Sequence, residues 1–167
     1  EHTLRMINSE PRLWWNVMDR LTQHAINLVD AQINHGAAAF QIFDSWVGAL
    51  DADTYRAHVL PHTARLFAEL RDLHPDVPGI HFGVGCSHLL EAMHEAGASV
   101  MGIDPTITLA AVRQRLGADV VLQGNLDPAA VLAGRDAAYH AATTRAHLKV
   151  GTTPVRKALR AASSAAA

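Results

Sequence analysis

The chain has 167 residues, of which 49% are apolar and 18% charged, and this size and mix fit one globular domain or a large piece of one. The mean hydropathy is +0.05, and no uncharged apolar stretch approaches the ~20 residues of a bilayer-spanning helix, so we expect no membrane span. A formal net charge of −2 gives no electrostatic reason to expect nucleic acid or an anionic membrane as a partner. Because the first residue is Glu1 rather than Met, we expect a trimmed chain or a piece of a longer one.

The charges are unevenly placed along the chain. Residues 1–135 hold nine Arg, fifteen Asp and Glu and no Lys, whereas residues 136–167 hold five basic residues against Asp136 alone. The single cysteine, Cys86, has no second cysteine in the chain with which to form a disulfide, which suits the reducing cytoplasm. We therefore expect a cytoplasmic protein whose sequence changes character near residue 135.

In chain order, the first predicted element is a long amphipathic helix. It starts at the candidate caps Asn8 and Ser9, carries Pro11 in its first turn and runs to about His35. The residues of its predicted apolar face recur at spacings of three and four and are Trp14, Val17, Met18, Leu21, Ala25, Leu28 and Val29. The apolar run that follows, Gly36–Ser45 (GAAAFQIFDS), predicts a strand after a helix that ends at glycine.

Three further units repeat this alternation of helix and strand. Residues 53–73 predict a helix with a break just before Pro61, and Gly79–Gly85 (GIHFGVG) predicts the second strand. Gly97–Asp104 (GASVMGID) and Gly117–Asn125 (GADVVLQGN) predict the third and fourth strands. Shorter helices are predicted at residues 87–96, 106–116 and 127–133.

This alternation predicts an α/β fold with a parallel sheet. The apolar runs are typical of strands buried on both faces, and the helices supply the crossovers that parallel strands require. Four consecutive βα units fit an open doubly wound sheet or part of a (β/α)8 TIM barrel. A complete barrel is typically about 250 residues, so we expect only part of one.

In both architectures the functional residues lie beyond the C-terminal ends of the strands. The polar and glycine residues at these ends are Asp44, Ser45, Gly83, Gly85, Asp104, Gln123, Gly124 and Asn125. Ser45 belongs to no nucleophile elbow, so we interpret it as a hydrogen-bond donor to a ligand in the barrel mouth. Asp44 and Asp104 fit two roles, acid–base groups or caps of the following helices, and the pattern leaves both open.

The segment GVGCSH, residues 83–88, has two weaker interpretations. Its glycines are similar to a phosphate-binding loop, but the spacing is not G-x-G-x-x-G, so we interpret them as turn glycines. Cys86 and His88, with His81 upstream, are candidate metal ligands, but no CxxC or HExxH motif accompanies them and we expect no metal. Histidines in the helices, such as His62, are expected to be solvated.

Three ordered motifs carry a resemblance to a known family. They are QIFDSWVG, HFGVGCSHLLEAMHEAGASVMGID and LQGNLDP. With them, the chain closely resembles uroporphyrinogen decarboxylase from about Met6 to Gly134. The resemblance implies that residues 1–135 are the C-terminal half of a (β/α)8 barrel.

The resemblance also implies a reaction and its participants. Members of this family are homodimers that use no metal or organic cofactor and remove CO2 from the four acetate side chains of uroporphyrinogen to give coproporphyrinogen. Of the matching positions, Ser45 aligns with a residue that contacts substrate. The family's arginine-bearing QAGRY segment, its catalytic aspartate and a tyrosine have no counterpart in this chain, so we assign it no catalytic residue and expect an inactive fragment.

The resemblance ends before the basic tail. Residues 136–167 lack the family's N-L-G-H-G motif and its last strand, and we expect a foreign or disordered Ala-rich tail; a divergent surface extension is the alternative. For the function, one alternative is the related group of corrinoid-dependent methyltransferases, which carry a His-x-Cys zinc motif near the position of His81 and Cys86. The other alternative is a non-catalytic half-barrel.

Overall fold

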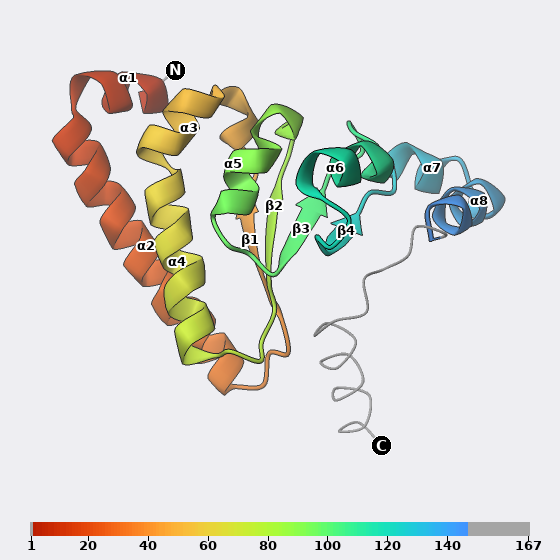
Figure 1. The fold of residues 1–167 in the computed structure, drawn as a ribbon, viewed down its shortest axis with the longest axis horizontal. Coiled ribbons are helices and arrows are strands. Elements are labelled where there is room, and N and C mark those ends of the chain that lie inside the picture. Colours follow the sequence, from red (N-terminus) through yellow and green to blue (C-terminus); the bar gives the residue numbers. More distant parts are fainter. Residues whose placement is uncertain (1, 147–167) are drawn as a thin grey trace.

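A four-stranded parallel sheet forms the centre of the computed structural model, which describes residues 2–146 (Figure 1). The strands, in the order β1-β2-β3-β4, are β1 (Phe40–Asp44), β2 (Gly79–Gly83), β3 (Val100–Ile103) and β4 (Leu122–Gly124). In the register of the sheet, Phe40 lies opposite Gly79, Ile80 opposite Val100, and Met101 opposite Leu122. Each predicted run contains one strand, which confirms the α/β fold and is consistent with part of a TIM barrel.

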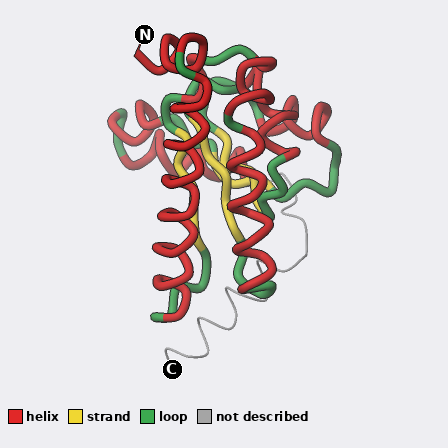
Figure 2. Tube along the Cα trace, turned by 90° about the vertical axis from the view of Figure 1, so that its left-hand side faces the viewer, coloured by secondary structure: helices red, strands yellow, loops and turns green. Residues whose placement is uncertain are grey.

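Helices connect all four strands. They are α1 (His2–Ser9), α2 (Pro11–Asn34), the 3-10 turn η1 (Val47–Ala49), α3 (Ala52–His58), α4 (Leu60–Leu73), the 3-10 turn η2 (Ser87–Leu89), α5 (Leu90–Glu95), α6 (Leu109–Leu116), α7 (Pro128–Leu132) and α8 (Arg135–Ala146). Figure 2 shows the two longest, α2 and α4, side by side next to the strands. Within residues 2–146, no helix is long and apolar enough to cross a membrane.

The predicted change of character after residue 135 falls partly within α8, which runs through residue 146. The rest of the predicted tail, residues 147–167, lies outside the described residues. The proposed domain boundary therefore stays a prediction.

The start of the first long helix differs from the prediction. The candidate caps Asn8 and Ser9 end a separate helix, α1, and α2 begins at Pro11 after Glu10, which makes no side-chain cap. The amide of Glu10 still donates to the carbonyl of Met6 at 2.9 Å, so α1 leads directly into the turn before α2. Proline begins the second helix because it has no N–H to leave unpaired in the first turn and its φ is already helical.

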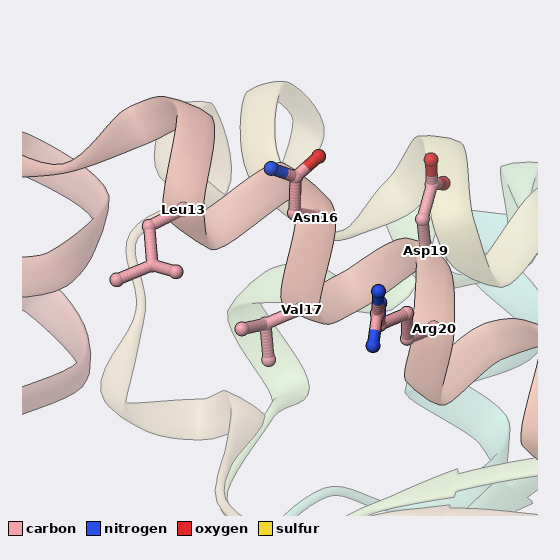
Figure 3. Close-up of a pocket in the computed structure, with 5 residues that line it drawn as sticks. All are labelled: Leu13, Asn16, Val17, Asp19 and Arg20. Atoms are coloured by element: carbon pink, nitrogen blue, oxygen red, sulfur yellow. The ribbon is translucent and has the colours of Figure 1, made fainter.

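The buried face of α2 also differs from the prediction. Leu21 and Leu28 are 59% and 54% exposed, whereas Thr22, Ile26 and Val29 are buried. The helix carries apolar residues on two faces, and the face with Ile26 and Val29 packs against the core of the sheet. The second face holds a hollow of 610 Å³ lined by Leu13, Asn16, Val17, Asp19 and Arg20 (Figure 3).

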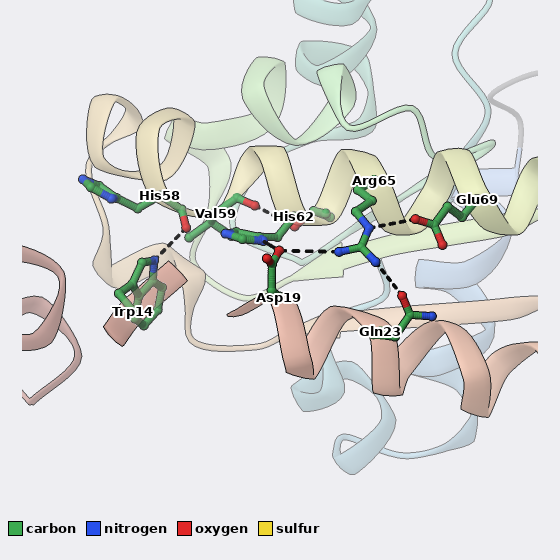
Figure 4. A network of polar contacts seen from close by, with 9 residues as sticks. Trp14, Asp19, Gln23, His58, Val59, His62, Arg65 and Glu69 are labelled. Carbon is green, nitrogen blue, oxygen red and sulfur yellow. Dashed lines mark hydrogen bonds and ion pairs between the residues drawn. The ribbon is translucent and has the colours of Figure 1, made fainter. Parts of the chain in front are cut away.

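The predicted break before Pro61 is confirmed. Val59, with φ −123° and ψ −50°, separates α3 from α4, and Pro61 lies in the first turn of α4. At this break the indole N–H of Trp14 donates to the carbonyl of His58 at 2.9 Å, so α2 is tied to the point where the helix changes direction (Figure 4).

A polar network continues this contact along α2 and α4 (Figure 4). Arg65 bonds to Asp19 at 3.4 Å and to Glu69 at 2.7 Å, and His62 Nδ1 lies 3.4 Å from Asp19. His62 is only 3% exposed and its ring lies 4.5 Å from that of Trp15, so its predicted solvation is wrong. Burial between the two helices lowers the pKa of His62.

The helices cover one face of the sheet and leave the other largely open. On the covered face, His81 and Met101 are 0% exposed and pack among residues of the helices. On the open face, Phe43 is 68% exposed. The expectation of strands buried on both faces therefore holds for β3 but is wrong for β1 and β4, because no described element lies over their second face.

Candidate functional site

The carboxyl ends of the four strands lie along one edge of the sheet, because every neighbouring pair is parallel. Asp44 lies opposite Gly83, and Ile103 lies opposite Gly124. The polar and glycine residues that follow the strands therefore gather at this edge, as the sequence predicts. We call this edge the rim.

Ser45, the predicted substrate-binding residue, lies on the rim directly after β1. It occupies the turn between β1 and η1, and it is exposed. Its hydroxyl is therefore accessible to a ligand from the solvent side of the rim. The described residues neither confirm nor contradict its predicted role.

The carboxylate of Asp44 points away from the open face. Its Oδ2 lies 3.7 Å from Nε2 of His81, a residue on the helix-covered face whose Nδ1 donates to the carbonyl of Met93 at 3.3 Å. Asp44 also lines a 340 Å³ cavity between the rim and α1 and α2, together with Trp14 and Trp46. The turn η1 begins without a side-chain cap, so the interpretation of Asp44 as a helix cap is wrong.

Asp104 is a buried residue that joins two loops of the rim. It is 5% exposed and accepts hydrogen bonds from the amide of Gly85 at 2.6 Å and from the amide of Thr106 at 3.0 Å, as well as from the Thr106 hydroxyl. This turn delays the next helix, which begins at Leu109 with Thr108 as its cap rather than at the predicted Thr106. Of the two roles left open for Asp104, the structure supports a structural one that resembles capping.

The glycines of GVGCSH allow a tight turn rather than an anion site. Gly85 has a φ of +62°, and its amide already bonds to Asp104. A Cβ on Gly83 would lie 2.9 Å from the sulfur of Cys86, and a Cβ on Gly48 would lie 2.5 Å from the carbonyl oxygen of Val84. Close packing at Gly83 and Gly48 and the positive φ of Gly85 therefore explain these glycines, in agreement with their interpretation as turn glycines.

The three candidate metal ligands do not converge. His81 faces the helices, Cys86 is 4% exposed, and exposed His88 bonds through Nε2 to the carbonyl of Leu50 at 2.8 Å. Burial raises the pKa of the Cys86 thiol to about 11, which disfavours the thiolate that binds zinc. Within residues 2–146, no three His, Cys, Asp or Glu side chains are grouped to hold a metal ion. The zinc site of the methyltransferase alternative is therefore not assembled from these residues.

A cavity of 280 Å³ opens on the rim between β3 and β4. The residues that line it are Gln41, Phe82, Gly102, Ile103, Asp104, Pro105, Gln123, Gly124, Asn125, Leu126 and Pro128. The buried side chain of Asn125 joins the segment after β4 to the loop after β3, because its Nδ2 donates to the carbonyl of Asp104 at 2.9 Å and to that of Ile107. Among these described lining residues there is no cation, and the carboxylate of Asp104 is buried and already bonded to the amides of Gly85 and Thr106, so the cavity suits a neutral or apolar portion of a ligand.

A family model describes nearly the whole chain. Residues 1–154 match the family "Uroporphyrinogen decarboxylase (URO-D)". The chain belongs to the uroporphyrinogen decarboxylase family. This confirms the resemblance carried by the three motifs.

Similar curated proteins of this family come from several bacteria. The chain is 47% identical to a uroporphyrinogen decarboxylase from Nocardia farcinica over 134 residues, which are 80% of this chain and 37% of the relative. It is 46% identical to that of Thermobifida fusca over 133 residues, 80% of this chain and 36% of the relative, and 44% identical to that of Streptomyces coelicolor over 137 residues, 82% and 38%. The chain thus spans little more than a third of the length of the curated relatives it matches.

Two features of the rim were not foreseen from the sequence. One is the contact between Asp44 and His81, and the other is the pair of hydrogen bonds from Asn125 to backbone carbonyls. Burial alternates along β2 and places His81 on the covered face. Because side chains alternate between the two faces of a strand, the side of the sheet on which His81 lies could have been predicted once one neighbour was placed. Nothing in the spacing of GNLDP indicates where the side chain of Asn125 points.

Proposed function

We propose that this chain is part of an enzyme that decarboxylates uroporphyrinogen to coproporphyrinogen in the cytoplasm, and that it supplies one side of the substrate site, with Ser45 as a substrate-binding residue. In this proposal the complete enzyme is a homodimer and uses no metal or organic cofactor. The observation that carries this proposal is the identity of 47% to a named uroporphyrinogen decarboxylase over 134 residues, which include every described rim residue.

The rim fits one portion of such a substrate. A porphyrinogen has a neutral macrocycle surrounded by carboxylates. The 280 Å³ cavity with Phe82, Gln41 and Gln123 offers an apolar surface and two amide groups, which suit contact with the neutral pyrroles. The exposed hydroxyl of Ser45 can donate to a substrate carboxylate, an interaction worth about 1.5–3 kcal/mol when one partner is charged.

The chemistry places a demand that these residues do not meet. Protonation of the pyrrole carbon that bears the acetate makes the ring an electron sink, CO2 leaves, and a second protonation completes the methyl group. Positive charge on the pyrrole and the substrate carboxylates both need charged partners. Because the described lining of the cavity has no cation, the partners of the substrate carboxylates must come from the portion of the enzyme that the relatives have and this match does not cover. The carboxylate in that lining, Asp104, already accepts hydrogen bonds from the amides of Gly85 and Thr106, so the partner of the pyrrole cation is expected in the same portion.

A chimera tests the proposal. In the complete enzyme of Nocardia farcinica, the 134-residue matched segment would be replaced by the corresponding residues of this chain. We expect coproporphyrinogen formation with a kcat/KM within about tenfold of that of the parent enzyme. If this segment has the same role in both proteins, the exchange should raise the activation free energy by less than ~1.4 kcal/mol, which corresponds to a tenfold change. The parent enzyme, purified in the same way, is the control. A chimera that folds as the parent does but forms no coproporphyrinogen would refute the proposal.

A further inference from the structure

The turn that carries Ser45 lies against the loop that follows β2. Ser45 and Trp46 lead into η1, where Gly48 meets the backbone of this second rim loop. A Cβ on Gly48 would lie 2.5 Å from the carbonyl oxygen of Val84 and 2.6 Å from that of Gly85. Cβ atoms in proteins essentially never come within 3.0 Å of another atom, so the two backbones touch only because residue 48 has no side chain.

The neighbours of Gly48 hold the same turn in place. Val47 is 4% exposed and belongs to the same core cluster as Cys86 of the loop after β2. On the other side of Gly48, Nε2 of His88 donates to the carbonyl of Leu50 at 2.8 Å. The amide of Leu50 donates in turn to the carbonyl of Val47 at 2.9 Å. The turn is therefore anchored both before and after Gly48.

The surface on which η1 lies is itself fixed. The amide of Gly85 donates to the carboxylate of Asp104 at 2.6 Å, and Asp104 is buried at the end of the next strand of the sheet. The atoms that a side chain at position 48 would meet are therefore backbone atoms of a bonded loop, which yield less readily than the end of a flexible side chain. All these contacts are made within residues 45–104 of this chain, so they do not depend on what the rest of the enzyme places around the rim.

We propose that Gly48 is a positioning residue for Ser45, because its lack of a side chain seats η1 on Val84 and Gly85 and thereby fixes where the hydroxyl of Ser45 stands on the rim. His88 holds the same turn through Leu50. This inference rests on the proposed function, in which Ser45 binds a substrate carboxylate. Gly48 touches no substrate in this role and acts only through Ser45.

The geometry predicts that a side chain at position 48 displaces Ser45 without removing it. A Cβ at 2.5 Å falls short of the 3.4 Å at which ordinary van der Waals contact begins, so Gly48→Ala should push η1 away from the loop by roughly 1 Å. A misplacement of this size can lower a rate on the order of a hundredfold. Gly48→Ala should therefore reproduce most of the kinetic defect of Ser45→Ala.

Steady-state kinetics of the chimera with the Nocardia farcinica enzyme give the test. Gly48→Ala should lower kcat/KM roughly tenfold, and the loss should divide between KM and kcat as it does in Ser45→Ala. In the double variant, Gly48→Ala should have little further effect, because the hydroxyl that it displaces is already absent. A merely structural role would lower kcat/KM by the same factor with and without the hydroxyl. An unchanged kcat/KM in Gly48→Ala, or equal factors in the two backgrounds, would overturn the proposal.

Ala49→Ser is the matched control, because it also adds one heavy atom to η1 but at an exposed residue, and its kcat/KM should stay within about twofold of that of the chimera. If Gly48→Ala is unfolded by circular dichroism, His88 gives the decision. His88→Ala removes the donor to Leu50 and should lower kcat/KM several-fold only while Ser45 is present. His88→Gln, whose amide can donate from nearly the same place, should restore it. His88→Ala with the kinetics of the chimera would then overturn the proposal.

The proposed function and the role of Gly48 fail in different ways. If the chimera forms no coproporphyrinogen, or if Ser45→Ala retains the kinetics of the chimera, the proposed function or the role of Ser45 is wrong and the role of Gly48 is refuted with it. If the chimera is active and Ser45→Ala is impaired, normal kinetics of Gly48→Ala refute the positioning role alone.

Discussion

Ser45 is the residue through which the rim is expected to act on substrate. In a complete enzyme carrying this segment, Ser45→Ala should lower kcat/KM roughly ten- to a hundredfold, because a hydrogen bond to a charged carboxylate is lost. The melting temperature should stay unchanged, since the hydroxyl is exposed. Steady-state kinetics and thermal unfolding of the same preparations check both parts.

The neighbouring Asp44 is the matched control for this change. Its carboxylate lies against His81 on the covered face, so Asp44→Ala should affect the free energy of unfolding more than substrate binding. If the two effects were exchanged, with Ser45→Ala destabilising and Asp44→Ala losing activity, the assignment of Ser45 to the substrate side would be wrong.

Cys86 predicts a loss of stability at alkaline pH. Burial raises the pKa of its thiol from 9.0 to about 11, so between these values the unfolded chain has lost a proton that the folded chain keeps. The stabilisation is complete below pH 9.0 and disappears as the pH rises to about 11, a change of about 3 kcal/mol. Urea unfolding at constant chain concentration should show this decline.

The control for this pH dependence is Cys86→Ala. The cavity left by the substitution should lower its free energy of unfolding by the same amount at every pH, and that free energy should not change between pH 9 and 10. Tyr55 also has a pKa raised by burial above its ordinary value of 10.0, so its contribution begins at higher pH and would remain in the control. An identical decline in both proteins below pH 10 would assign the effect to another group.

At the scale of elements, Asp104 joins the loop after β2 to the turn after β3. Asp104→Ala leaves the buried amide of Gly85 and the Thr106 group without their acceptor, and should reduce the free energy of unfolding by about 3 kcal/mol. Asp127→Ala is a useful comparison, because this exposed cap bonds to one amide of α7 and its loss should cost only about 1 kcal/mol. Equal losses in the two variants, measured by urea unfolding, would show that the connection between the loops stabilises the fold no more than an exposed helix cap does.

The same elements show what the sequence could predict. Glycine-bounded apolar runs located all four strands, and parallel pairing then placed Asp44, Asp104 and Asn125 on one edge without further information. The directions of these side chains were not predictable, because Asp44 turns to His81 and Asp104 turns to Gly85, residues that only the folded chain brings near. The rim could therefore be predicted as a location but not as a set of contacts.

The prediction of the buried face of α2 was wrong for a related reason. The helix has apolar residues on two faces, and spacing alone cannot say which of them meets the sheet. Leu21, predicted on the buried face, is exposed, and the neighbouring Thr22 is buried instead.

At the scale of the whole molecule, the chain should not turn over uroporphyrinogen by itself. The carboxylate among the described lining residues of the rim cavity, Asp104, already bonds to the amides of Gly85 and Thr106, and the segments to which the resemblance assigns catalysis have no counterpart in this chain. Electrostatic stabilisation of a cationic pyrrole supplies several kcal/mol of barrier lowering in typical cases, so its absence should reduce the rate by a factor of about a thousand or more.

The measurement is coproporphyrinogen formation by the purified chain, with the complete enzyme from Nocardia farcinica assayed alongside it. No product above the uncatalysed background is expected from the chain at any concentration. Product formed at a rate proportional to chain concentration, and lost in Ser45→Ala, would show instead that the rim residues carry catalysis themselves. In that case the charged partners of the pyrrole and of the substrate carboxylates would have to be sought among residues of this chain, and the division of work between this segment and the rest of the enzyme would be wrong.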